Sequence, residues 1–242
     1  MNPLLYSIAF VFIVGLLAWP VGKWLTWTVR TNRLDPFLGI LLGKNISQGS
    51  NWKQYFLNLL GYNAVMFAIT WGVLANQQHL PFNPDGMKAI PWHLVFNTTV
   101  SFVTNTNLQH YSGESTLSHL SQLTLMWLQF TSAATGIAAF VALTRGLSGS
   151  RNFGNFAQDT ARILILFLLP LATLWAVAYT LTGVPMTMQG SATATTLEGA
   201  TQMISRGPVA AFLAIKQLGT NGGGFFGPNS THPFENPGFI SN

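Results

Sequence analysis

The sequence predicts an all-α membrane protein with four transmembrane helices and two shorter, re-entrant half-helices. Three observations lead to this fold class. Of the 242 residues, 49% are apolar and only 7% are charged, whereas soluble domains carry about 25% charged residues. Charge-free stretches recur along the chain, and several reach the roughly 20 residues that a helix needs to cross a bilayer. This composition excludes a soluble enzyme and a nucleic-acid-binding protein, so membrane lipid is the expected surrounding.

Four stretches are expected to span the membrane, and the basic residues between them indicate their orientation. The stretches are 3–24, 55–75, 117–143 and 163–184. Pro170 lies inside the fourth and predicts a kink, which a packed bundle tolerates. Eight of the 11 Lys and Arg residues, counting Lys23 at the end of span one, fall between spans one and two or between spans three and four. The positive-inside rule therefore places these two loops in the cytoplasm and the N-terminus outside.

The segment between spans two and three is too short to cross. Residues 91–103, beginning with a proline that suits a helix start, extend about 20 Å as a helix. Because span three has to run inward, the connection must return to the outer side. We expect a half-helix that enters the membrane and turns back; a helix lying on the outer surface is the alternative.

A second half-helix is expected at 197–218, after span four. It is interrupted near Gly207-Pro208 and carries three charged residues, Glu198, Arg206 and Lys216. A Lys or Arg at the centre of a lipid-exposed helix costs about 2.5–3.5 kcal/mol on insertion scales. The segment is therefore expected to be shielded by protein.

Similar polar turns follow both half-helices. A half-helix running inward directs its C-terminal carbonyls toward the membrane centre, which favours a cation there. Glycine permits backbone angles that could aim neighbouring carbonyls at one ion, and neutral oxygens without a carboxylate suit a monovalent ion. The sequence thus predicts a filter for a monovalent cation, with potassium favoured by analogy with carbonyl filters. Its predicted residues are Thr104, Asn105, Thr106, Asn107, Thr220, Asn221, Gly222 and Gly223.

Two carboxylates follow these turns, and two other functional classes compete with an ion filter. Glu114 and Glu235 could concentrate cations at the outer mouth or simply be solvated loop residues. Residues 222–227 match G-x-G-x-x-G, but an apolar helix precedes them and Pro228 follows, unlike a dinucleotide site. The five histidines are scattered and suit interfacial positions better than metal or haem ligation. The competing functions are a membrane oxidoreductase and a structural protein that anchors partners without binding ions.

Three long motifs resemble one family. They are Asn-Trp-Lys-Gln-Tyr at 51–55, residues 101–107 with 111–114, and residues 219–226 with 232–237. Together they closely resemble the potassium-binding A subunit of the bacterial Kdp potassium-transporting ATPase. The resemblance implies a multi-pass protein of the bacterial plasma membrane, of the potassium-transporter superfamily, in which four pore-loop repeats surround one filter. It also implies that Gln109 sits near the ion path.

The same resemblance implies a non-catalytic role in an ATP-driven potassium uptake pump. Potassium would bind from the outer side and pass to a separate P-type ATPase, the Kdp B protein, which hydrolyses ATP. The Kdp C and F proteins would be further partners. No organic cofactor is expected.

The repeated order of helix, half-helix, polar loop and helix also suggests how the chain is organised. We expect an N-terminal helix and basic loop at 1–54, a first repeat at 55–144, a cytoplasmic loop at 145–162, and a second repeat at 163–242 that lacks its closing helix. The family is about twice this length, so two filter segments supply half a ring. A fragment, a frameshifted product and a half-size protein that pairs with another chain all stay open, as does a non-functional or assembly-only role.

Overall fold

The computed structural model describes residues 3–43, 46 and 48–241, and it is predominantly helical. Four of its helical stretches are long and apolar enough to cross a membrane, namely Leu4–Arg30, Trp52–Ala75, His119–Leu147 and Phe156–Leu181. They coincide with the four predicted spans, which this finding confirms by length and composition. The α-helices are α1 (Pro3–Arg30), α2 (Asp35–Leu42), α3 (Trp52–Ala75), α4 (Trp92–Val103), α5 (Gly113–Thr116), α6 (His119–Leu147), α7 (Phe156–Ile163), α8 (Leu169–Leu181) and α9 (Val209–Leu218).

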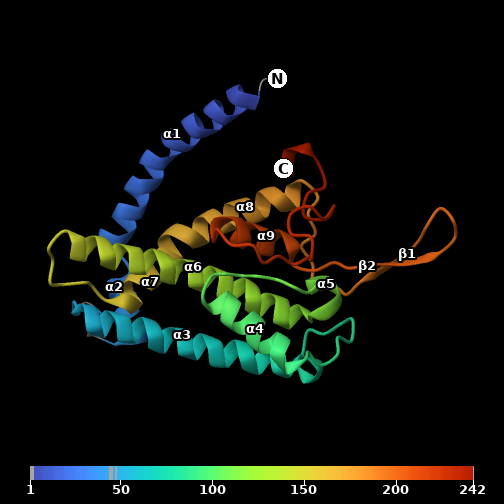
Figure 1. Cartoon of the computed structure of the whole chain (residues 1–242), viewed down its shortest axis with the longest axis horizontal. Helices are drawn as coiled ribbons and strands as arrows, with labels where there is room; N and C mark the ends of the chain where they lie inside the picture. Colours follow the sequence, from blue (N-terminus) through green and yellow to red (C-terminus); the bar gives the residue numbers. More distant parts are fainter. Residues whose placement is uncertain (1–2, 44–45, 47, 242) are drawn as a thin grey trace.

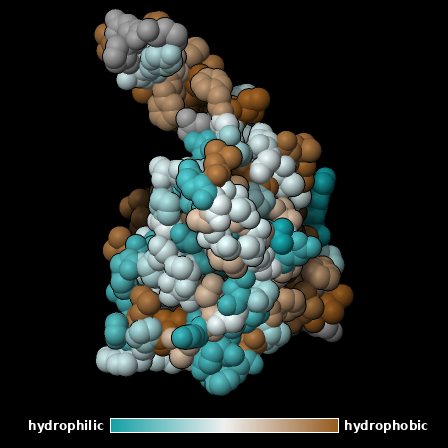
Figure 2. Space-filling model, turned by 90° about the vertical axis from the view of Figure 1, so that its right-hand side faces the viewer, coloured by the Kyte–Doolittle hydropathy of each residue, from teal (hydrophilic) through white to brown (hydrophobic). Residues whose placement is uncertain are grey.

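Helix α6 is the centre of the arrangement (Figure 1). It packs against α3, α4, α7 and α9, and α8 lies along α9. Helix α3 ends, and α6 begins, at the same end of the bundle, with α4 between them. The apolar helix α1 projects away from the others, and its residues 4–22 are exposed. Seen from the end where α3 stops, polar residues cover most of the middle and apolar residues lie toward the sides (Figure 2).

Local sequence explains where the spanning helices begin. Asn51 and Gln54 form a capping box at the start of α3, in which each side chain binds the other residue's backbone N–H. Ser118 caps α6 by accepting the N–H of Ser121, and Asn155 caps α7 by accepting two backbone N–H groups. The third and fourth spans are thereby separated by a capped turn.

The fourth span is irregular at the position of its proline. A π-helical segment, η3 (Leu164–Leu168), joins α7 to α8, and Pro170 stands in the first turn of α8. Proline has no N–H to donate, and the wider π turn accommodates this within a helix that continues from Phe156 to Leu181. The helix is therefore irregular next to Pro170, where the sequence predicts a kink.

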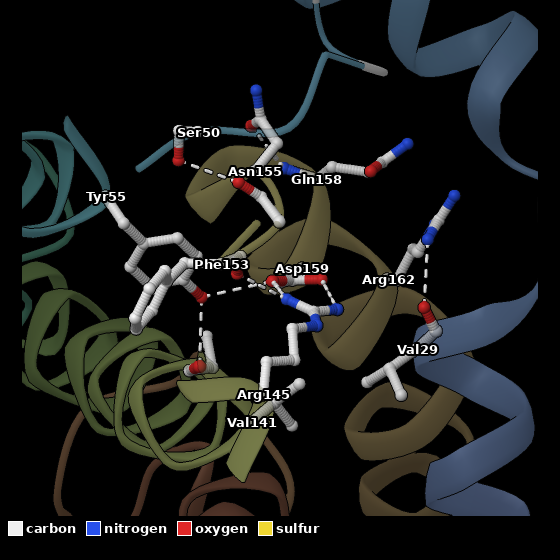
Figure 3. A network of polar contacts seen from close by, with 12 residues as sticks. Val29, Ser50, Tyr55, Val141, Arg145, Phe153, Asn155, Gln158, Asp159 and Arg162 are labelled. Atoms are coloured by element: carbon white, nitrogen blue, oxygen red, sulfur yellow. Dashed lines mark hydrogen bonds and ion pairs between the residues drawn. The ribbon is translucent and has the colours of Figure 1, made fainter. Parts of the chain in front are cut away.

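A polar network joins the helices at the end of the bundle where α3 begins and α6 ends (Figure 3). The Asp159 carboxylate of α7 binds the Arg145 guanidinium of α6 at 2.5 and 3.0 Å and accepts the Tyr55 hydroxyl of α3 at 3.1 Å. One helical turn further on, Arg162 donates to the Val29 carbonyl of α1 at 3.0 Å and pairs with Asp35 of α2 at 2.5 Å. Helix α7 thus ties together elements from both halves of the sequence.

The short helix predicted at 91–103 is present as α4, with Pro91 immediately before it. Its last turn is buried against α3 and α6: Ser101, Phe102 and Val103 are each less than 10% exposed. Helix α4 is therefore a packed element of the bundle.

The prediction of a helix over 197–218 is wrong for its first half. Residues 192–204 form an antiparallel hairpin of β1 (Ala192–Thr195) and β2 (Thr201–Ile204), and only α9 (Val209–Leu218) is helical. The alternating threonines before Leu197 favour a strand, and Gly199 turns the chain with a φ of 82°. The fold consequently contains one small hairpin, which projects from the end of the bundle (Figure 1). The expected shielding of the segment is confirmed for Lys216, which is 3% exposed, but not for Glu198, which is exposed in the hairpin.

Candidate functional site

The polar segments that follow α4 and α9 lie against each other. We call residues 104–109 turn 1 and residues 219–225 turn 2. The Asn105 amide of turn 1 donates to the Gly219 carbonyl of turn 2 at 3.2 Å. The Gln109 side chain makes two hydrogen bonds to Gly224, donating to its carbonyl at 3.1 Å and accepting its N–H at 2.9 Å. Segments about 115 residues apart in the sequence therefore form one site.

Left-handed backbone in these turns occurs at non-glycine residues. Asn105, Asn107 and Thr220 have φ values of 58°, 52° and 53°. Asparagine tolerates this conformation, but a β-branched threonine adopts it only when its surroundings impose it. The three glycines at 222–224 are not left-handed. The expectation that glycine's conformational freedom aims the carbonyls of turn 2 is therefore corrected.

Close packing explains two of the three glycines instead. A Cβ at Gly223 would lie 2.5 Å from the Phe102 ring and 3.0 Å from the Gln129 amide nitrogen. A Cβ at Gly224 would lie 2.5 Å from the Asn229 side-chain oxygen and 3.1 Å from a Glu235 oxygen. Neither position has room for a methyl group. At Gly222 the nearest atom is the Asn107 carbonyl oxygen of turn 1, at 3.9 Å. Gly222 therefore faces the space between the turns.

Eight carbonyls of the two turns have no hydrogen-bond donor from the described residues. Seven of them form two runs, at residues 104–107 and 220–222, and the eighth belongs to Gln109. Other carbonyls of turn 2 already accept hydrogen bonds. The Gly219 carbonyl accepts from Asn105. Two glutamines of α6 donate to the others, Gln129 to Gly223 at 2.5 Å and Gln122 to Phe225 at 3.1 Å. Of the seven residues in the two runs, only Asn107 is buried, and the others are half-buried or exposed. Their free carbonyls can therefore be satisfied by water or by a cation. The arrangement thus offers a set of uncharged oxygens to such a ligand.

The predicted filter residues are all in this site, with one change of detail. Thr104 and Thr106 hydroxyls contact each other at 2.9 Å, and Asn107 donates to the Asn105 side chain at 3.3 Å. The Asn105 oxygen also accepts from Ser132 of α6 at 2.9 Å. Gly223, which the sequence grouped with the filter, has its carbonyl already engaged by Gln129.

The two carboxylates occupy different environments. Glu114 is half-buried and accepts the N–H of Gly227 at 2.9 Å. Glu235 is 2% exposed and lies 3.3 Å from the Lys216 ammonium. The expectation of an exposed mouth or loop carboxylate is therefore corrected for Glu235, which is neutralised by a buried partner. The Tyr111 phenol is neutral at neutral pH, and burial raises its pKa further.

Two glutamines of α6 were not anticipated from the sequence. Gln122 and Gln129 are fully buried, and both donate to backbone carbonyls of turn 2. They stand seven residues apart, which places them on one face of the helix. That spacing of two amides within an otherwise apolar span was the available signal, because polar groups inside a span usually face the interior of the bundle.

Comparison with known proteins identifies the family. The family described as "Potassium-transporting ATPase A subunit" matches residues 8–242. The chain belongs to this family. It is 47% identical over 247 residues to a potassium-transporting ATPase potassium-binding subunit of Pseudomonas putida, with 97% of this chain and 44% of the relative covered. It is 44% identical over 254 residues to the subunit of the same name from Flavobacterium psychrophilum, covering all of this chain and 44% of the relative.

A further potassium-binding subunit, from Brucella anthropi, is 46% identical over 253 residues, with 100% of this chain and 45% of the relative covered. The chain thus spans a little under half the length of these curated relatives. Membership of the A-subunit family confirms the resemblance noted from the motifs. Together with the four apolar helices, it makes this a multi-pass membrane protein.

Proposed function

We propose that turns 1 and 2 bind a potassium ion. The observation that carries this proposal is the set of seven carbonyls, at 104–107 and 220–222, that no donor among the described residues reaches. Backbone and hydroxyl oxygens can replace the hydration shell of a weakly hydrated ion, and the turns themselves contain no carboxylate that would favour a divalent ion. The relatives are named potassium-binding subunits, which supports potassium over sodium.

Individual residues take different parts in this proposal. The predicted filter residues Thr104, Asn105, Thr106, Asn107, Thr220, Asn221 and Gly222 supply oxygens, while Gly223 allows turn 2 to approach α4 and α6. Gln109 lies beside the ion path and joins the two turns. Glu114 attracts cations toward the outer entrance.

The proposal includes an orientation in the membrane. Helices α4 and α9 enter from the outer side as re-entrant half-helices within two repeats, 55–144 and 163–242. The N-terminus lies outside. The loop at 145–162 and the basic loop after α1 lie in the cytoplasm of a bacterium. Potassium therefore enters the filter from the outer face of the inner membrane. The distribution of basic residues supports this orientation.

As a member of the A-subunit family, the chain is proposed to act as a non-catalytic part of an ATP-driven potassium uptake pump. ATP hydrolysis would occur on the P-type ATPase of the complex, the Kdp B protein, to which the bound potassium passes. The Kdp C and F proteins would complete the assembly. The family description and the relatives' names, which call these proteins subunits of a potassium-transporting ATPase, support this role.

Ion-dependent stabilisation of the full chain tests potassium binding. A ligand that binds only the folded state stabilises it by about 2.7 kcal/mol at 100 times its Kd. Thermal unfolding in detergent is followed in potassium, sodium and choline chloride at equal ionic strength. We expect a higher Tm in potassium chloride than in the other two salts, and equal values in all three would contradict the proposal.

Copurification with the other pump proteins separates the competing functions. A chain that assembles but shows no potassium effect would be a component that anchors partners without binding ions. A chain that shows neither would be a non-functional fragment. Potassium stabilisation together with assembly is the result that we expect.

A further inference from the structure

One buried ion pair lies beside turn 2, away from the network at the other end of the bundle. The Lys216 ammonium, in the last turn of α9, is 3.3 Å from the Glu235 carboxylate, and the two side chains are 3% and 1% exposed. Two buried charges are costly to remove from water, and such a pair is not by itself a source of stability. Its position therefore needs another explanation.

Glu235 holds the backbone that directly follows the predicted filter. Its two oxygens accept the N–H groups of Phe226, at 3.4 Å, and of Ser230. A Cβ on Gly224 would lie 3.1 Å from a Glu235 oxygen and 3.2 Å from the Lys216 nitrogen. The ion pair is thus in contact with turn 2, two residues beyond the last unoccupied carbonyl.

Each charge alone would act on a cation bound in the turns. An uncompensated ammonium in a low-dielectric interior repels a potassium ion, and an uncompensated carboxylate attracts it. With both side chains present, their electric fields largely cancel, and Glu235 still accepts the backbone N–H groups of Phe226 and Ser230. The carbonyls at the end of α9 stabilise the positive charge of Lys216. This charge therefore remains close to the turns, and Glu235 compensates it.

We propose that Lys216 and Glu235 are a positioning pair that fixes the backbone after turn 2 and balances the charge felt by an ion between the turns. This inference rests on the proposed potassium binding. It assigns two residues outside the oxygen ligands themselves to the tuning of potassium affinity.

Single and double substitutions in the full chain test the pair. Glu235→Gln leaves Lys216 unpaired, and we expect potassium affinity to fall on the order of tenfold. At the effective dielectric constant of a protein, the repulsion between two unit charges at an assumed separation of about 10 Å corresponds to an affinity change of that size. Lys216→Met leaves the carboxylate, and affinity is expected to equal or exceed that of the unmodified chain. The double variant, Lys216→Met with Glu235→Gln, is expected to recover within about threefold of the unmodified chain.

Affinity is read from the potassium dependence of Tm, and the Tm in choline chloride reports folding separately. Glu198→Gln and Lys88→Met make the same chemical changes at exposed positions and are the matched controls. A merely structural pair would lower potassium affinity in both single variants, and that result would overturn the inference. If Glu235→Gln does not fold, Lys216→Met decides alone, since a reduced affinity contradicts charge balance. An unmodified chain without any potassium response would instead refute the proposed function.

Discussion

Substitution of the adjacent glycines 222 and 223 tests the geometry of turn 2. A methyl group at Gly223 would lie 2.5 Å from Cζ and 3.1 Å from Cε1 of the Phe102 ring, and 3.0 Å from the Gln129 nitrogen. Phe102 is fully buried, and a shift of its ring has to displace neighbouring residues of a close-packed core. At Gly222 the nearest atom to a new methyl group is 3.9 Å away, an ordinary contact distance.

The expected magnitudes follow from this difference. Overpacking of a filled core costs about 1–3 kcal/mol, and for a chain of this size each kcal/mol lowers Tm by about 2–4 °C. Gly223→Ala is therefore expected to lower Tm by about 2–12 °C. Gly222→Ala is expected to change the free energy of unfolding by less than about 0.5 kcal/mol, as for substitutions that break no contact.

The assay is thermal unfolding of the detergent-solubilised chain without potassium, followed by tryptophan fluorescence. Repeating it in potassium chloride shows the complementary effect. Gly222→Ala places its methyl group toward Asn107, between the turns, so the potassium-dependent gain in Tm should shrink although the fold is intact. Equal destabilisation by the two substitutions in the absence of potassium would refute the assignment of Gly223 to close packing and of Gly222 to the gap.

Three further substitutions test the framework around the site. Asp159→Ala removes the partner of the partly exposed Arg145 and is expected to cost about 2 kcal/mol, measured by thermal unfolding; an unchanged Tm would contradict a structural role for the network in Figure 3. Asn51→Ala removes the capping box with Gln54 and should cost about 1 kcal/mol in the same assay, with no loss of potassium response. Gln129→Leu leaves the buried Gly223 carbonyl without its donor and should cost about 1–3 kcal/mol; a stability equal to that of the unmodified chain would show that this hydrogen bond does not hold turn 2.

Helices with a strong local signal agreed with their sequence-based prediction. The four apolar spans and the short helix after Pro91 follow from hydropathy, length and a proline at the start of a helix. The segment 197–208 was predicted incorrectly because it was assigned from apolar content together with charge. Alternating threonines and a glycine turn give it a hairpin instead.

The composition of the two turns could be found in the sequence, but the contacts between them could not. Polar residues after each short helix identified the candidate filter, and long motifs identified the family. The pairing of Gln109 with Gly224, the donation from Gln129 to Gly223 and the burial of Glu235 against Lys216 join residues that are 19 to 115 positions apart.

By itself, the sequence determined that this chain is a membrane protein, which segments can span the bilayer and which two turns offer neutral oxygens. These properties depend on composition and on short-range patterns, since hydropathy and backbone preferences act over one helix at a time. Only the tertiary structure decided which carbonyls are left unoccupied and which glycines are required by packing. Those outcomes depend on where α4, α6 and α9 meet, and side chains from distant segments compete there for the same backbone atoms.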